Sequence, residues 1–343
     1  MRTKHISSGQ AQIPIIPDSR FEEIMDKKVI PYLTSICQTG YMEILPGGGS
    51  LYYESYCPQG AKGAVVISHG YTESIEKYKE VIYYFVKAGY QVYLADHRGH
   101  GRSFRETTHP NMVHVNRFTD YVKDLHAFVT GIVQPSCGSL PLYLYAHSMG
   151  GCIGAFYLEI YPHTFQRAIL NAPMLGISVG IPALAGRILG RIMMCLHREN
   201  TYAPGQHAFV PGKNFKDSCS ACLQRYRYYQ RKREQNPLLQ NSGSSFGWAY
   251  QSLNACNFIT QKKNCKRIAV PVLVFQSTND STVKGSAIVS FVRHTPSAHL
   301  VKVPESKHEI YNSPARVLRG YYDKIFRFLS AAGQSDITEL KVD

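Results

Sequence analysis

The chain has 343 residues, of which 44% are hydrophobic, so it can bury the core of one large domain or of two ordinary ones. A chain that is disordered over most of its length is therefore excluded. Its 38 Lys and Arg residues exceed its 24 Asp and Glu residues by 14, and a formal net charge of +14 points to an anionic partner. The candidates are a nucleic acid, an anionic membrane or an acidic substrate.

Residues 1–17 contain no apolar core of signal-peptide length, so secretion is not expected. An uncharged run lies between Arg167 and Arg187, but Pro173 and Pro182 interrupt it, so it does not predict a membrane-spanning helix. Nine cysteines, an odd number in a chain of this size, favour free thiols in a reducing compartment. We therefore expect a cytoplasmic protein.

The first predicted elements are a helix over 21–37 and two strands, 41–45 and 51–56, joined by a turn at Gly47–Gly49. This hairpin is expected at an antiparallel edge of a sheet. From residue 64 onward, β-branched and aromatic runs alternate with amphipathic stretches. Strands are predicted at 64–68, 91–95, 140–145, 167–170, 272–276 and 300–303. Helices are predicted at 76–87, 118–133, from the run 146–151 to about 161, at 284–293, and after Ser313 as N-cap with Pro314 at the first position.

This alternation is typical of a mostly parallel sheet with helices on both faces, so the predicted fold class is α/β. Residues 173–268 separate two strands of one parallel set and are interpreted as an insertion at one end of the sheet. From Arg187 to Ile268 this segment has 14 Lys or Arg residues and only 3 acidic residues. We divide the chain into an N-terminal extension and helix (1–38), a first core part (39–172), a basic cap (173–268), a second core part (269–330) and a flexible tail (331–343).

Ser148 stands between a predicted strand and a predicted helix, with the small residues Ala146 and Gly150 two positions before and after it. This arrangement is typical of a nucleophile elbow, whose turn is too tight for larger neighbours. Ala146 departs from the usual Gly-x-Ser-x-Gly pattern. Taken alone, the motif fits equally well an ordinary strand-to-helix turn with Ser148 as a capping residue.

A nucleophilic serine needs a histidine base that a carboxylate orients, and in a fold of this kind the chain order is Ser, acid, His. Asp280 and His308 each follow a predicted strand, at the same sheet edge as Ser148. We therefore predict a catalytic triad of Ser148, Asp280 and His308. Asp96 is expected instead to fix a loop by accepting hydrogen bonds from backbone amides. Chain order disfavours as the base the upstream histidines His69, His97, His100, His109, His114 and His147.

An acyl-transfer site also needs backbone donors for the tetrahedral oxyanion. The first should be the amide of Met149, directly after the nucleophile at a helix N-terminus. The second should be the amide of Tyr71, in the His69-Gly70-Tyr71 loop after the first parallel strand. No cofactor is predicted because no nucleotide-binding or phosphate-loop motif occurs, and no metal site is predicted because the pair Cys219 and Cys222 lacks a second pair.

Four segments carry a family resemblance: the elbow at 146–151, the His69-Gly70 loop, 96–103 and 114–122. Together they resemble the bacterial PldB-type lysophospholipases, in the monoacylglycerol-lipase-like, serine aminopeptidase S33-like branch of the α/β-hydrolases. The similarity extends from about 41 to 329, whereas the N-terminal forty residues and the acid loop at 276–280 depart from the family pattern.

The resemblance implies an α/β-hydrolase fold with a helical cap, and a lysophospholipase that releases the fatty acid of lysophospholipids through an acyl-serine intermediate. In that role Ser148 is the nucleophile, His308 the base and Asp280 the orienting acid. Glu73 matches a position where related lipases also have Glu, and we expect a structural role for it. Two alternatives stay open: a monoacylglycerol lipase or general carboxylesterase, and a catalytically silent fold that binds lipid or a partner.

The segment after Pro173 places apolar residues at helical spacing with Arg187 and Arg191 between them. This pattern fits a lid that contacts an anionic membrane, and it also fits a cap helix that buries its apolar face. The basic and aromatic run 225–233 fits a nucleic-acid patch, a surface that attracts anionic lipid, or a solvated helix face. No nucleic-acid motif accompanies it, so no nucleic-acid partner is expected. The expected partners are a lysophospholipid and, peripherally, the inner face of the cytoplasmic membrane.

Overall fold

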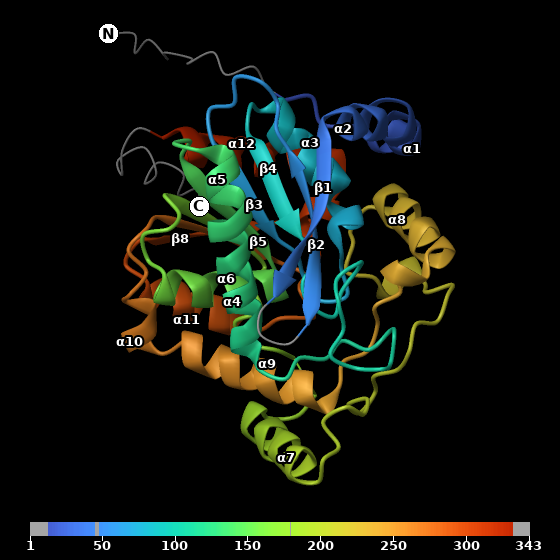
Figure 1. Cartoon of the computed structure of the whole chain (residues 1–343), viewed down its shortest axis with the longest axis vertical. Helices are drawn as coiled ribbons and strands as arrows, with labels where there is room; N and C mark the ends of the chain where they lie inside the picture. Colours follow the sequence, from blue (N-terminus) through green and yellow to red (C-terminus); the bar gives the residue numbers. More distant parts are fainter. Residues whose placement is uncertain (1–12, 45–47, 179, 332–343) are drawn as a thin grey trace.

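The computed structural model describes residues 13–44, 48–178 and 180–331, which are built around an eight-stranded sheet (Figure 1). The strands are Cys37–Ile44 (β1), Gly49–Tyr56 (β2), Ala64–Ser68 (β3), Gln91–Ala95 (β4), Leu142–His147 (β5), Arg167–Asn171 (β6), Val272–Ser277 (β7) and Ala298–Val303 (β8). Their order in the sheet is β1-β2-β4-β3-β5-β6-β7-β8. Strand β2 pairs antiparallel with β1 and β4, and the other pairs are parallel. The predicted α/β class with an antiparallel edge hairpin is confirmed.

Strand β3 shows why these segments form strands. Val65 and Ile67 are buried on one face of the sheet, whereas Ala64 and Val66 are buried on the other. A parallel strand that is covered on both faces needs a continuous apolar run of this kind, rich in β-branched residues. For the same reason the predicted bounds of β3 and β4 agree with the structure to the residue.

Helices cover both faces of the sheet. One face packs against Phe21–Ile24 (α1), Ile30–Ile36 (α2), Lys79–Lys87 (α3) and Ala315–Ser330 (α12). The other packs against Phe118–Phe128 (α4), Met149–Ile160 (α6), Phe246–Ile259 (α9) and Gly285–His294 (α11). Shorter helical segments are Asp18–Arg20 (η1), Met25–Val29 (η2), Ile75–Tyr78 (η3), Val129–Val133 (η4), Gln134–Cys137 (α5) and Ile310–Asn312 (η7).

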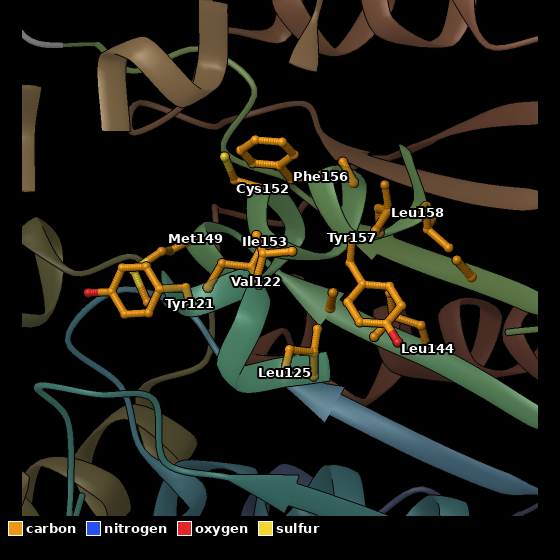
Figure 2. Packing of buried hydrophobic residues seen from close by; sticks show 14 of the residues in the cluster. Tyr121, Val122, Leu125, Leu144, Met149, Cys152, Ile153, Phe156, Tyr157 and Leu158 are labelled. Carbon is orange, nitrogen blue, oxygen red and sulfur yellow. The ribbon is translucent and has the colours of Figure 1, made fainter. Parts of the chain in front are cut away.

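Helix α6, which follows Ser148, is held in place by its contact with α4. Figure 2 shows Tyr121, Val122 and Leu125 of α4 beside Ile153 of α6, and all of these side chains are buried. Burying each large apolar side chain stabilises the fold by about 1.5–3 kcal/mol. The position of the α6 N-terminus is therefore fixed by the core.

Two predicted details differ from the structure, and a third lies outside the described residues. The helix predicted to end at 133 continues to Cys137 through η4 and α5. The prediction of Ser313 as N-cap is wrong, because α12 begins at Ala315 and the Ser313 hydroxyl has no hydrogen-bond partner among the described residues. The Ala315 amide instead donates to Asp18 Oδ1 at 3.0 Å, so the cap comes from the other end of the chain. Gly47 of the predicted hairpin turn lies outside the described residues.

The predicted insertion at 173–268 contains four helices among its described residues: Ala183–Cys195 (α7), Leu223–Gln235 (α8), α9 and Lys262–Cys265 (α10). It also contains two short turns, Phe215–Asp217 (η5) and Pro237–Leu239 (η6). Helix α7 packs on α9, whereas α8 lies beside α1 (Figure 1). Within the described ranges, no helix has both the length and the apolar content needed to cross a membrane.

Candidate active site

Ser148 occupies the turn between β5 and α6 in a strained backbone conformation. Its φ is 53° and its ψ is −116°, a region that L-residues rarely adopt. A Cβ atom at Gly150 would lie 2.1 Å from the carbonyl oxygen of Ser68, so only glycine fits there. Ala146 is accommodated because its methyl group is buried in the hydrophobic core. The segment therefore has the backbone geometry of a nucleophile elbow although it lacks the first glycine.

Two hydrogen bonds join Ser148, Asp280 and His308. The Nε2 atom of His308 lies 2.8 Å from Ser148 Oγ, and its Nδ1 atom lies 2.7 Å from Asp280 Oδ2. All three side chains are largely buried. With the Nδ1 proton donated to the carboxylate, the lone pair of Nε2 faces the serine hydroxyl, which is the arrangement a general base requires.

Asp280 is held by its own loop, which leaves the end of β7. Its Oδ1 atom accepts hydrogen bonds from the amides of Thr282 at 2.8 Å and Val283 at 3.1 Å. Burial by itself raises the pKa of Asp280, but the hydrogen bond and charge of His308, together with these amides, hold that pKa below its usual value. Asp280 is therefore ionised at neutral pH and can orient the imidazole.

The amides of Met149 and Tyr71 have no hydrogen-bond partner within the described part of the chain. Met149 is the first residue of α6, where amides are free by geometry. The loop of Tyr71 lies against the elbow, because a Cβ atom at Gly70 would be 2.9 Å from His147 Cδ2. Both amides can therefore donate to an oxyanion formed beside Ser148.

Glu73 ties this loop to the loop of His308. Its Oε2 atom accepts hydrogen bonds from the Gly70 amide at 2.7 Å and the Tyr78 hydroxyl at 2.6 Å. Its Oε1 atom accepts from the Tyr311 hydroxyl at 2.6 Å, three residues after His308. Burial alone raises the pKa of Glu73, but the positive charge of Lys77 and the tyrosine hydroxyls outweigh burial and hold the pKa well below its usual value. The structural role expected for Glu73 thus includes a link between two loops of the site.

That link could not be predicted from the sequence, because Glu73 and Tyr311 are 238 positions apart. The sequence does show that Glu73 and Lys77 are four residues apart, a spacing that can bring opposite charges together. In the structure Lys77 Nζ lies 3.0 Å from Glu73 Oε1.

The histidines nearest to the site have structural partners. His147 Nδ1 lies 3.2 Å from the carbonyl oxygen of Asn171, and His69 Nε2 accepts a hydrogen bond from the His97 amide at 2.9 Å. Burial lowers the pKa of His147 to about 4, so this residue is neutral at pH 7. The structure therefore places these side chains in the framework around Ser148.

Asp96 has the role that the sequence predicted. Its carboxylate accepts hydrogen bonds from the amide of Ile75 at 2.8 Å and the amide of Arg102 at 3.0 Å. It thereby fixes the segment 96–102 beside η3 and has no hydrogen bond to His308.

Three of the cations of α8 pair with carboxylates of the chain. The Arg225 side chain is fully buried and binds Glu80 at 2.7 Å, and it also contacts Asp18. Arg231 pairs with Glu22 and Lys232 with Glu76, each at 2.6 Å. Much of the charge in the run 225–233 is therefore compensated inside the chain.

Helix α7 has the opposite arrangement. Leu184, Ile188 and Ile192, which are four residues apart and share one face, are 65%, 55% and 50% exposed. The other face has glycines that allow close packing on α9: a Cβ atom at Gly190 would lie 2.8 Å from Tyr250 Cβ. The sequence fitted both a lid with an exposed apolar face and a cap helix with a buried one. In the structure, the apolar face of α7 is exposed.

The described ranges contain no group of three or more His, Cys, Asp or Glu side chains placed to hold a metal ion. Cys219 Sγ lies 3.7 Å from Thr282 Oγ1, whereas Cys222 Sγ lies 3.4 Å from a guanidinium nitrogen of Arg225. The two sulfur atoms thus have separate neighbours.

Known proteins resemble this chain both in sequence and in fold. The protein called probable lysophospholipase L2 of Haemophilus influenzae is 27% identical over 78% of this chain and 83% of its own. Lysophospholipase L2 of Escherichia coli is 34% identical over 64% of each chain. The monoacylglycerol lipase of Mycolicibacterium smegmatis is 28% identical over 79% of this chain and 90% of its own.

Among solved structures, a soluble variant of the monoglyceride lipase of Saccharomyces cerevisiae superimposes with a TM-score of 0.66 and 15% identity. The superposition covers 89% of this chain and 95% of that one, which supports a shared fold. The family model described as serine aminopeptidase, S33, matches residues 59–315. The chain therefore belongs to the serine aminopeptidase S33 family of α/β-hydrolases.

Proposed function

We propose that this protein is a serine hydrolase of lipid carboxylic esters and that its substrates are lysophospholipids. The observation that carries the proposal is the pair of hydrogen bonds from His308 to Ser148 and Asp280. A catalytically silent fold has no need of this arrangement, nor of a strained serine backbone.

In the proposed reaction, Ser148 Oγ attacks the acyl carbonyl carbon while His308 Nε2 accepts the hydroxyl proton. The amides of Met149 and Tyr71 stabilise the resulting oxyanion. The intermediate collapses to an acyl-serine, and His308 returns the proton to the departing alcohol. A water molecule then attacks the acyl group, His308 again accepts the proton, and the fatty acid leaves as Ser148 regains its hydrogen.

The choice of lysophospholipid is supported by the relatives from Haemophilus influenzae and Escherichia coli, both called lysophospholipase L2. The second candidate is an uncharged monoacylglycerol, since the relative from Mycolicibacterium smegmatis is called a monoacylglycerol lipase. Both substrates undergo the same chemistry at Ser148 and differ in the group attached to glycerol.

We also propose that residues 173–268 form a cap whose helix α7 contacts a lipid surface. Its exposed face of Leu184, Ile188 and Ile192 would cost free energy in water unless an apolar phase covers it. Arg191 is exposed on the same helix and can meet lipid phosphates. The core then consists of residues 39–172 and 269–330. We propose that the enzyme is cytoplasmic and that it docks peripherally on the membrane through α7.

The test is fatty-acid release from lysophosphatidylethanolamine, lysophosphatidylcholine and monoacylglycerol by the wild type and by Ser148→Ala. We expect the variant to lose roughly 10³-fold or more of the activity and to keep its fold. The matched control is Ser139→Ala, at an exposed serine in the turn before β5, which should keep full activity. Full activity in Ser148→Ala would refute the assignment of the nucleophile, and release from monoacylglycerol alone would favour the second substrate.

A further inference from the structure

A cavity of about 510 Å³ lies between the oxyanion loop and the cap. Tyr71 and Thr72 line it on the core side, and the cap contributes residues of the loop 205–213 and of α8. We call it the Tyr71 cavity. Tyr71 connects this cavity to the site, because it lines the cavity and its amide is the oxyanion donor that we propose.

The charge of the lining is positive. Arg233 and Lys213 line the cavity, whereas no acidic side chain does so among the described residues. Glu234 is close in sequence, but its carboxylate accepts a hydrogen bond from the Gly212 amide at 3.0 Å and does not line the cavity. An anion in the Tyr71 cavity would therefore meet cations without a competing lining carboxylate.

Arg233 has no carboxylate partner in the described part of the chain, unlike Arg225 and Arg231 of the same helix. Its guanidinium donates to the carbonyl oxygens of Leu239 and Asn241 and lies 4.6 Å from the ring centre of Phe209. Neutral carbonyls and a ring fix its position but leave its charge uncompensated. A guanidinium fixed in this way is well suited to a phosphoryl oxygen.

Gln230 gives an independent indication of a ligand. It lines the Tyr71 cavity, its residue is only 9% exposed, and its amide nitrogen Nε2 has no hydrogen-bond partner among the described residues. A buried donor that stays unpaired destabilises a fold by about 1–3 kcal/mol. A rotation of the side chain toward the cavity would let the buried Nε2 atom donate to a bound acceptor oxygen and so remove that cost.

We propose that the Tyr71 cavity binds the phosphoryl group of the substrate, a glycerophosphate ester, through Arg233, Lys213 and Gln230. This inference rests on the proposed function and makes it specific: the subsite selects esters whose glycerol carries a phosphoryl group over neutral glycerides. The acyl ester stays at Ser148 while the charged part of the leaving alcohol occupies the cavity.

The first test measures binding without catalysis. The full-length Ser148→Ala protein is titrated with two non-hydrolysable ethers in neutral detergent micelles, 1-O-alkyl-glycerol 3-phosphate and 1-O-alkyl-glycerol. We expect the phosphorylated ether to bind at least tenfold more tightly, and Gln230→Glu or Lys213→Gln to reduce that preference about tenfold. Gln230→Glu nearly preserves volume, whereas replacing Arg233 would also remove two backbone contacts.

Lys263→Gln removes an exposed cation of the cap outside the cavity and should leave the preference unchanged. Inorganic phosphate as a competitor distinguishes the two possible sources of the anion. Displacement of the ether only at phosphate concentrations far above that of the ether supports a headgroup subsite. Equal affinity for the two ethers, or a preference that Lys263→Gln reduces as much as Gln230→Glu does, would overturn the proposal.

The second test measures kcat/KM for two esters with the same acyl chain, 1-acyl-glycerol 3-phosphate and 1-monoacylglycerol. The ratio of the two values should fall about tenfold in Gln230→Glu. Hydrolysis of both esters with one ratio in all variants would overturn the subsite and leave the proposed function standing. Selective binding of the phosphorylated ether by a wild type that hydrolyses neither ester would support the subsite and refute the proposed function.

Discussion

Helices α7 and α8 belong to the same basic segment of the sequence, and the structure uses them in opposite ways. The α8 cation Arg225 is buried between Glu80 and Asp18, so this helix is fastened to the core and to the N-terminal segment. Helix α7 keeps Leu184 and Ile188 exposed. A surplus of basic residues in a sequence therefore does not imply unpaired charge in the structure, and an apolar helix face need not be buried.

The largest expected effect comes from breaking the attachment of α8. Arg225→Met should lower the free energy of unfolding by about 3–5 kcal/mol, because Glu80 and Asp18 would be left as buried or half-buried charges without their partner. Denaturant unfolding of the wild type and the variant measures this loss. A decrease below about 1 kcal/mol would show that α8 is not fastened by this residue.

Glu159 extends the comparison to a buried carboxyl group that has no hydrogen-bond partner among the described residues. It lies at the C-terminal end of α6, is 3% exposed, and neither of its carboxylate oxygens has a hydrogen-bond partner within the described ranges. Burial raises its pKa to about 9, and the positive charge of Arg267 offsets only part of that rise. The negative end of the α6 dipole acts in the same direction as burial.

Because this pKa is raised in the folded state, folding takes up a proton between pH 4.5 and about 9, and stability is lost as the pH rises through that range. At pH 7 the loss amounts to about 3 kcal/mol. Glu159→Gln should remove most of it, so that the stabilities at pH 5 and pH 8 come closer together. Glu22→Gln, at an exposed carboxylate, is the control. An unchanged pH profile in Glu159→Gln would contradict the raised pKa.

The fold was largely predictable because its strands are local signals. Strands β3 and β4 are short runs of buried residues next to glycine or turn segments, and their bounds follow from that composition. The site was predictable in a different way. The order of Ser148, Asp280 and His308, each after a strand, was enough to identify side chains that the structure joins by hydrogen bonds, although their catalytic role stays a prediction.

What the sequence could not provide are contacts between distant segments. The cap of α12 by Asp18 and the link between Glu73 and Tyr311 join residues more than 230 positions apart. The orientation of α7 was equally hidden, because its exposed and packed faces are distinguished by Gly186 and Gly190 meeting α9. Such pairings depend on the completed fold and leave no periodic pattern in the chain.

A smaller effect is expected at the apolar face of α7. Replacing Ile188 by Ser should weaken binding to lipid vesicles about tenfold, because an apolar side chain of this size gains about 1.5–3 kcal/mol when it leaves water. Stability should change little, since Ile188 is 55% exposed. Vesicle co-sedimentation and thermal unfolding separate the two effects. Undiminished vesicle binding would show that α7 does not contact the lipid.

The smallest effects compare one cation from each helix directly. Arg191→Gln removes an exposed charge of α7 and should weaken binding to anionic vesicles about fivefold, at about 1 kcal/mol for each cation near the surface. Arg231→Gln removes a charge of α8 that is already paired with Glu22, and should leave vesicle binding unchanged while lowering stability by less than about 1 kcal/mol. Raising the salt concentration should diminish the first effect by screening. Equal losses in both variants would mean that net charge alone attracts the membrane, because the internal pairing of α8 would then make no difference to the lipid.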